Sequence, residues 1–98
     1  MTAMGPDRER LERLRLEIDG IDAELASLFQ RRMDVVAEVA VVKRRAGLPV
    51  YDAPREQAVI SRGRGRVSPE NADGVEMLLR LIMGLSKSRQ EELTIDTI

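Results

Sequence analysis

The sequence predicts an all-α protein with a long, a short and a medium helix, assembled as an intertwined homodimer. Apolar residues recur at steps of three and four along most of the chain, which is the periodicity of amphipathic helices. Glycine and proline gather where this rhythm stops, and the first apolar stripe is too long for a globule of this size. The 98 residues, with a mass of 11.0 kDa, suit a single domain over residues 1–98 with a core of about residues 8–92.

The longest stripe runs from Asp7 to about Ala46 and predicts the first helix. Its apolar members are Leu11, Leu14, Ile18, Ile21, Leu25, Leu28, Val35, Val39 and Val42. Gly47 followed by Pro49 is a typical stop, since glycine adopts the left-handed cap and proline prevents resumption. Such a helix is about 57 Å long, whereas a compact monomer has a radius of gyration of about 12.6 Å. The stripe must be covered, and we expect a second copy of the chain to cover it.

The second helix follows a short link. Ala53 precedes a proline and is expected as its cap, with Pro54 as the first helical residue. The helix should end near Arg62, because Gly63 and Gly65 follow.

The third helix is expected to open at Ser68, with Pro69 as its first residue and Glu70 as a first-turn acid. Its apolar positions are Val75, Leu78, Leu79, Ile82, Met83 and Leu85. The pattern fades near Leu93, and residues 94–98 are expected to be frayed.

Composition excludes several kinds of chemistry. The chain has no cysteine and no histidine, which removes disulfides, thiol catalysis, imidazole bases and thiolate or imidazole metal sites. An oxygen-ligand site for magnesium stays open on these grounds, although we expect neither a metal nor a cofactor. With 16 basic and 17 acidic residues and two aromatic side chains, Phe29 and Tyr51, no nucleic-acid partner is expected.

Hydropathy indicates no membrane partner. No apolar run approaches the length of about 20 residues that a membrane-spanning helix needs. The first six residues lack the basic and apolar regions of a secretory signal. We therefore expect a soluble cytoplasmic protein.

Polar residues interrupt the apolar rhythm at functionally interesting places. The stripe of the first helix requires an apolar residue at position 32 but has Arg32, and Lys43 lies close to three turns further on nearly the same side. A buried arginine without a partner is costly, so this side is expected to meet an anion. The alternative is that both cations snorkel or pair with acids such as Asp34 or Glu38.

The third helix has the same anomaly. Its stripe continues onto Ser86 and Gln90, one turn apart, where apolar residues are expected. Either these side chains serve a polar site, or the end of the helix simply emerges into solvent.

Two further groups of charges are candidates. Arg15 lies about 100° around the first helix from Arg32, so it could reach only a partner's pocket, or it is an ordinary solvated arginine. Asp52, Arg55 and Glu56 stand at the start of the second helix, where the two acids could act as helix-start charges alone. The Arg-Gly run of residues 62–66 is interpreted as a solvated loop.

The spacing and order of these polar residues resemble the all-helical (type II) chorismate mutase family. The likeness is carried by Leu14-Arg15 to Asp22, Arg31-Arg32-Met33, Val36-Ala37-Glu38-Val39 with Lys43, Gly47-Leu48-Pro49-Val50 with Arg55-Glu56, and Ser86 with Gln90. It covers about residues 8–92, and Pro54 and the short Arg-Gly link depart from the commonest form of the family. No fused dehydratase or dehydrogenase domain accompanies it, so a stand-alone module is expected.

The resemblance implies a homodimer with two sites, each completed by the partner's first helix, and an activity in aromatic amino acid biosynthesis. Arg15 would bind one substrate carboxylate from the partner subunit, and Arg32 the other. Lys43 and Gln90 would donate to the ether oxygen. The ring hydroxyl would be held by Glu56, near the backbone of Asp52. Ser86 and Arg55 would give supporting contacts, and a partner enzyme of the shikimate pathway is a further expectation.

The implied chemistry agrees with the residue inventory. Chorismate rearranges to prephenate within one molecule, without nucleophile, base, metal or redox cofactor. The reaction needs a clamp for the chair-like dianion and donors at the oxygen that gains charge. Two arginines match two carboxylates. Because a glutamine donates at any pH, Gln90 predicts a broad pH profile between about pH 5 and 7.5.

Two alternatives stay open at this point. A related enzyme could act on isochorismate or 4-amino-4-deoxychorismate, since both present the same dianion. A helical dimerisation module without catalysis would need only the long helix, and it predicts that Arg32 and Lys43 are solvated or ion-paired on the surface.

Overall fold

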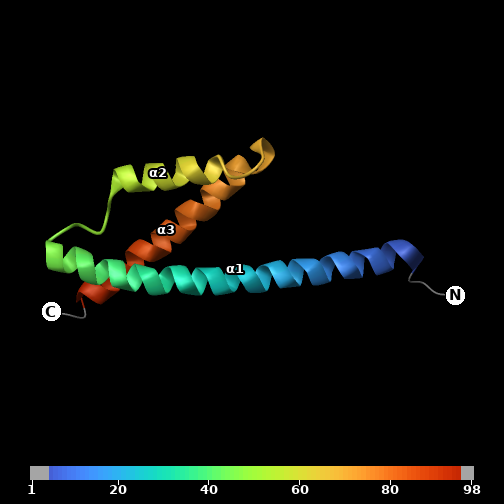
Figure 1. Ribbon diagram of the computed structural model, residues 1–98, viewed down its shortest axis with the longest axis horizontal. Coiled ribbons are helices and arrows are strands. Elements are labelled where there is room, and N and C mark those ends of the chain that lie inside the picture. The colour runs from blue at the N-terminus through green and yellow to red at the C-terminus, as the bar shows by residue number, and fades with distance from the viewer. Residues whose placement is uncertain (1–4, 96–98) are drawn as a thin grey trace. The chain divides into compact units, whose positions relative to one another are not determined.

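The computed structural model describes residues 5–95, in which every regular element is a helix and short links join the helices (Figure 1). Its elements are α1 (Gly5–Ala46), α2 (Ala53–Arg64), a 3₁₀ turn η1 (Pro69–Asn71) and α3 (Ala72–Ile95). The predicted all-α fold with long, short and medium helices is confirmed. The chain divides into two units, residues 1–32 and residues 33–98, which are described separately.

The first unit is the N-terminal part of α1, which begins two residues before the predicted start. Every side chain from position 6 to position 31 is exposed. The apolar stripe is therefore uncovered in the single chain: Leu14 is 42% exposed, Ile21 55% and Leu28 54%. An apolar stripe along a helix is stable in water only when another surface covers it.

The end of α1 has the predicted glycine cap. Gly47 adopts a left-handed φ of 69°. The Leu48 amide donates to the Lys43 carbonyl at 2.8 Å, and the Gly47 amide donates to the Arg44 carbonyl at 3.2 Å. This pair of bonds is the Schellman motif, which satisfies carbonyl groups that a helix end otherwise leaves unpaired.

The start of α2 differs by one residue from the prediction. Asp52, rather than Ala53, is the cap: its backbone is extended, and its carboxylate accepts a hydrogen bond from the Arg55 amide at 3.0 Å. The proline restriction on Ala53 did not exclude helix there, and an aspartate is a far better cap than an alanine because its oxygen can bond to an orphan amide.

Gly63 does not end α2, which continues to Arg64. Gly65 follows as the cap, in a right-handed conformation, with its amide donating to the Ser61 carbonyl at 3.2 Å. Gly63 is buried, and a Cβ added to it would meet Leu79 Cδ1 of α3. The glycine therefore allows two helices to approach closely, a tertiary role that the sequence does not distinguish from termination.

The third helix is preceded by a separate turn. Ser68 stands at the N-cap position of η1 without a capping bond from its side chain, and α3 begins only at Ala72. The helix continues to Ile95, past the predicted end near Leu93, and the Thr94 hydroxyl donates to the Gln90 carbonyl at 2.9 Å. The remaining positions that were expected to fray, 96–98, lie outside the described residues.

In the second unit, α2 and α3 lie side by side (Figure 1). The buried apolar residues are few: Val36, Ala40, Ile60, Ala72 and Met83. Large apolar side chains of α3 stay uncovered, with Leu81 62% and Met77 72% exposed. The unit thus has a small core of its own and further apolar surface available for burial.

A network of charges joins α2 to the start of α3. Arg64 Nη1 lies 2.8 Å from an Asp73 oxygen and 3.0 Å from Glu76 Oε1, while Arg80 Nη2 lies 2.8 Å from Glu76 Oε2. Hydrogen bonding from Arg80, with a further contribution from Arg64, holds the pKa of the Glu76 carboxyl below its ordinary value. The bond to Asp73 raises the pKa of Arg64 in the same way.

Replacing Glu76 with glutamine should lower stability slightly, and only above acidic pH. Because the folded-state pKa of Glu76 is lowered from 4.5, its ion pairs stabilise the fold fully above that value and lose their effect as the pH falls through the folded-state pKa. Urea unfolding midpoints should therefore differ between wild type and E76Q at pH 7 and converge on acidification below 4.5. E70Q is the control, since Glu70 forms none of the ion pairs found in residues 5–95. A pH-independent difference for E76Q would contradict this account.

Candidate functional site

Two polar side chains are buried on α3. Ser86 is 5% exposed and Gln90 6% exposed. The Ser86 hydroxyl donates to the Ile82 carbonyl at 2.7 Å and contacts Met33 Sδ at 4.0 Å. The alternative that this end of α3 emerges into solvent is therefore wrong. These residues occupy apolar positions of the stripe and are nonetheless inside.

Gln90 carries an unused bonding group. Its Oε1 atom is buried and has no hydrogen-bond partner in the part of the chain that the structure describes. Leaving a buried amide group unpaired costs about 1–3 kcal/mol. Because the oxygen and nitrogen of an amide are interchangeable by a flip, the group can accept from or donate to a ligand. This atom is the strongest structural indication of a binding site.

Lys43 is half-buried near the end of α1. Its ammonium donates to the Val50 carbonyl, in the link to α2, at 2.7 Å. No acidic side chain among residues 5–95 forms an ion pair with it, so the suggested pairing with Glu38 is not found. An ammonium has three donors, and the Val50 carbonyl uses one of them. Lys43 therefore holds the link in place and keeps donor capacity for an anion.

Lys43 also borders a hollow of about 290 Å³. Its other lining residues are Val35, Glu38, Val39 and Val42. All of these residues belong to α1. The hollow is therefore a groove on the surface of one helix, and its opposite side is open.

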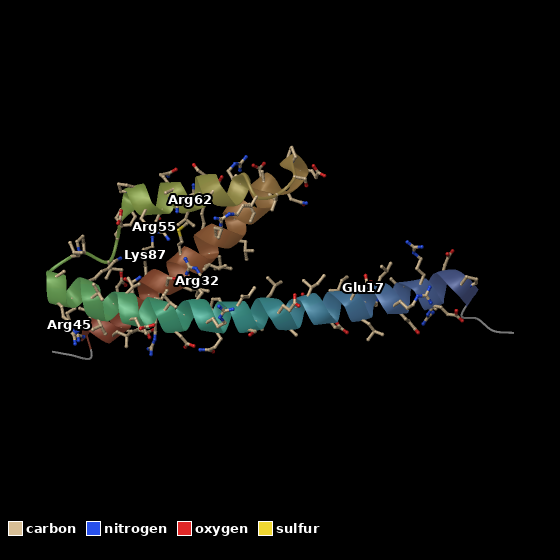
Figure 2. The ribbon with its side chains drawn as sticks, viewed as in Figure 1. Glu17, Arg32, Arg45, Arg55, Arg62 and Lys87 are labelled. Atoms are coloured by element: carbon tan, nitrogen blue, oxygen red, sulfur yellow. The ribbon has the colours of Figure 1, made fainter. Side chains whose placement is uncertain are left out.

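Glu56 has a partner that was not predicted. Its Oε2 atom lies 2.8 Å from the ammonium of Lys87, on α3, and the same ammonium lies 4.9 Å from the centre of the Tyr51 ring. Figure 2 shows Lys87 on the side of α3 that faces the start of α2. Nothing in the sequence signals this pair, because its members lie on different helices and follow no local spacing.

These contacts join several candidates at one end of the second unit. Lys43 bonds to Val50, the neighbouring Tyr51 contacts Lys87, and Lys87 pairs with Glu56. Gln90 lies three residues after Lys87, so the two are neighbours on the surface of α3. A cation, a carboxylate and an amide with unused bonding capacity thus come from three different helices.

The remaining candidates have other surroundings. Arg15 and Arg32 belong to the first unit, where Arg15 is exposed and Arg32 is half-buried. Asp52 serves as the cap of α2, as its alternative interpretation proposed, and Arg55 is exposed. Glu56, by contrast, does not cap the helix but reaches to α3.

Residues 5–95 contain neither a metal-binding cluster nor a helix that could span a membrane. No group of three or more acidic side chains there is placed to hold a metal ion. None of the described helices is long and apolar enough to cross a membrane.

Fold and site together define an all-α protein with a partly buried set of cationic, amide and carboxylate groups, suited to a small polar anion. The sequence profile of the chorismate mutase type II family matches residues 14–91. The chain belongs to this family.

Similar proteins agree with that membership. The T-protein of Haemophilus influenzae is 37% identical over 92 residues, which cover 92% of this chain and 24% of the T-protein. A chorismate mutase of Methanocaldococcus jannaschii is 27% identical over 91% of this chain and 92% of its own length. The intracellular chorismate mutase of Mycolicibacterium smegmatis is 34% identical over 76% of this chain and 71% of its own. The chain thus spans about a quarter of the T-proteins that it matches, with coverage of 24%. No solved structure matches it significantly.

Proposed function

We propose that the chain is a chorismate mutase that rearranges chorismate to prephenate by clamping the chair-like dianion. The observation that carries this proposal is the buried Gln90 amide with an unused bonding group, on the same unit as the partly buried ammonium of Lys43. Two donors of this kind suit an ether oxygen that becomes negative as its bond to carbon breaks.

The reaction makes modest demands on the protein. It proceeds within one molecule, so the barrier falls when the flexible substrate is held in its compact conformer. Arginine forks hold carboxylates in fixed directions, and a partly dry site strengthens donors aimed at the developing charge. The residues of this chain supply both functions.

The proposed roles follow the family pattern at matching positions. Lys43 and Gln90 donate to the ether oxygen, Arg32 binds one carboxylate, Arg15 of the second subunit binds the other, Glu56 accepts from the ring hydroxyl next to the Asp52 backbone, and Ser86 and Arg55 support these contacts. The burial of Ser86 and Gln90 and the position of Glu56 beside α3 support these roles.

We further propose a homodimer with shared sites. The stripe along the first unit is exposed by between 42% and 55% at Leu14, Ile18, Ile21, Leu25 and Leu28. The hollow beside Lys43 is lined from α1 alone. A second copy would cover both with its own long helix. Arg15, which is exposed in the single chain, would then enter the partner's site.

The test is direct. Purified protein mixed with chorismate should remove the absorbance of the substrate, and the product should be prephenate. Parallel reactions with isochorismate and 4-amino-4-deoxychorismate identify the preferred substrate, and R32A protein purified identically controls for a contaminating mutase. Pyruvate release from isochorismate as the dominant reaction would favour a lyase. No reaction with any of the three would favour a non-catalytic dimerisation module.

A further inference from the structure

The carboxylate of Glu56 is already matched by a positive charge. Lys87 approaches its Oε2 atom to 2.8 Å, and the two side chains are 33% and 20% exposed respectively. Such a pair is partly screened by water, yet it is more protected than an ion pair on the open surface. The pair carries no net charge, and its contact uses the Oε2 atom of Glu56 rather than Oε1.

The position of the Lys87 charge is defined from two sides. Glu56 holds the ammonium from α2, and the Tyr51 ring lies 4.9 Å from it on the link before α2. A cation over an aromatic face is attracted by the ring electrons. Two different elements thus hold the ammonium near the Glu56 carboxylate.

On the basis of the proposed function, we infer that Lys87 is a specificity-determining residue: it makes the Glu56 subsite accept a neutral hydroxyl group and reject an amine that carries a proton. A lone carboxylate binds an ammonium more strongly than a hydroxyl, because the charges attract. With Lys87 present, an incoming ammonium brings a second positive charge to the same carboxylate. A hydroxyl group meets no such repulsion and needs only one lone pair.

Distance gives the size of the effect. A ligand atom in hydrogen-bond contact with the Glu56 carboxylate lies within about 8 Å of the Lys87 ammonium, even when it uses the farther oxygen. Like charges at this separation in a half-buried site repel enough to change binding about tenfold. The Glu56 subsite should therefore prefer chorismate, which has a ring hydroxyl, to 4-amino-4-deoxychorismate, whose amine is protonated near neutral pH.

The experiment measures kcat/KM for both substrates with wild type, K87M and K87R. The wild type should prefer chorismate. Removing the charge in K87M should raise the amine-to-hydroxyl ratio of kcat/KM about tenfold. K87R keeps the charge and should keep the preference. R89M is the matched control, because Arg89 is also on α3 but pairs with Glu92 at 3.1 Å rather than with Glu56, and its ratio should equal that of wild type.

The outcomes separate the two levels of the proposal. An unchanged ratio in K87M overturns the inference, even when both rates fall together, because Lys87 would then only position Glu56. The same ratio change in R89M as in K87M also overturns it, since a general loss of positive charge would explain both. A wild type that converts neither substrate contradicts the proposed function, and the role of Lys87 fails with it.

Discussion

Replacing Arg32 with alanine should lower kcat/KM for chorismate about a thousandfold or more while the protein stays dimeric. Arg32 occupies an apolar position of the α1 stripe and is half-buried, whereas Arg15 and Arg31 of the same helix are exposed. A fork that binds a carboxylate in the reactive conformer contributes to the transition state as well as to binding. Steady-state kinetics with size-exclusion chromatography would measure both properties.

Arg31 provides the matched control for this change. It is the preceding residue on the same helix, it is exposed, and it carries the same charge. R31A should therefore keep kcat/KM within a few-fold of wild type. Equal losses in R31A and R32A would show a general electrostatic effect, and an unaffected R32A would remove Arg32 from the site and favour the non-catalytic alternative.

Replacing Gln90 with glutamate should make the reaction depend on acid. An ionised carboxylate cannot donate to the ether oxygen and repels the dianion, so kcat/KM should fall about a hundredfold or more near neutral pH. Burial raises the pKa of a carboxyl group introduced there. Activity should therefore recover as the pH is lowered through that raised pKa, whereas wild type should stay nearly constant between about pH 5 and 7.5.

Gln57 offers the same chemical change outside the site. It is exposed on α2, so Q57E adds an equal charge without touching a buried group. Its pH profile should match that of wild type. A Q90E profile that stays flat would show that the Gln90 side chain does not donate in the reaction, and a wild type that loses activity between pH 5 and 7.5 would contradict the same assignment.

The helices were predictable because their signals are local. The apolar stripe of α1 and the glycine cap at Gly47 follow from periodicity and backbone geometry, and both are observed. The residues whose roles were predicted wrongly are those whose roles depend on tertiary packing. Glycine is a residue type that often ends helices, but Gly63 instead allows close contact with Leu79. Leu79 lies 16 positions away in sequence, and only folding brings the two residues together.

The candidate site was predictable where a residue broke its own helix pattern. Ser86 and Gln90 were singled out as polar groups at apolar positions, and their burial is confirmed. Lys87 follows no such rule, because an exposed-looking lysine between serines gives no sign of a carboxylate on another helix. Arg15 shows a second limit: its surroundings in a single chain are solvent, so its proposed role depends on a second copy.

Subunit mixing tests directly whether the site is built from two chains. R15A and R32A homodimers should each be nearly inactive, since every site lacks one arginine. In a mixed dimer, the site of the R15A chain has its own Arg32 and receives Arg15 from the R32A chain, so one intact site is restored. Unfolding and refolding the two variants together should recover about a quarter of wild-type activity, because half of the dimers are mixed and each has one intact site. Activity that stays at the level of the separate variants would contradict a site shared between subunits.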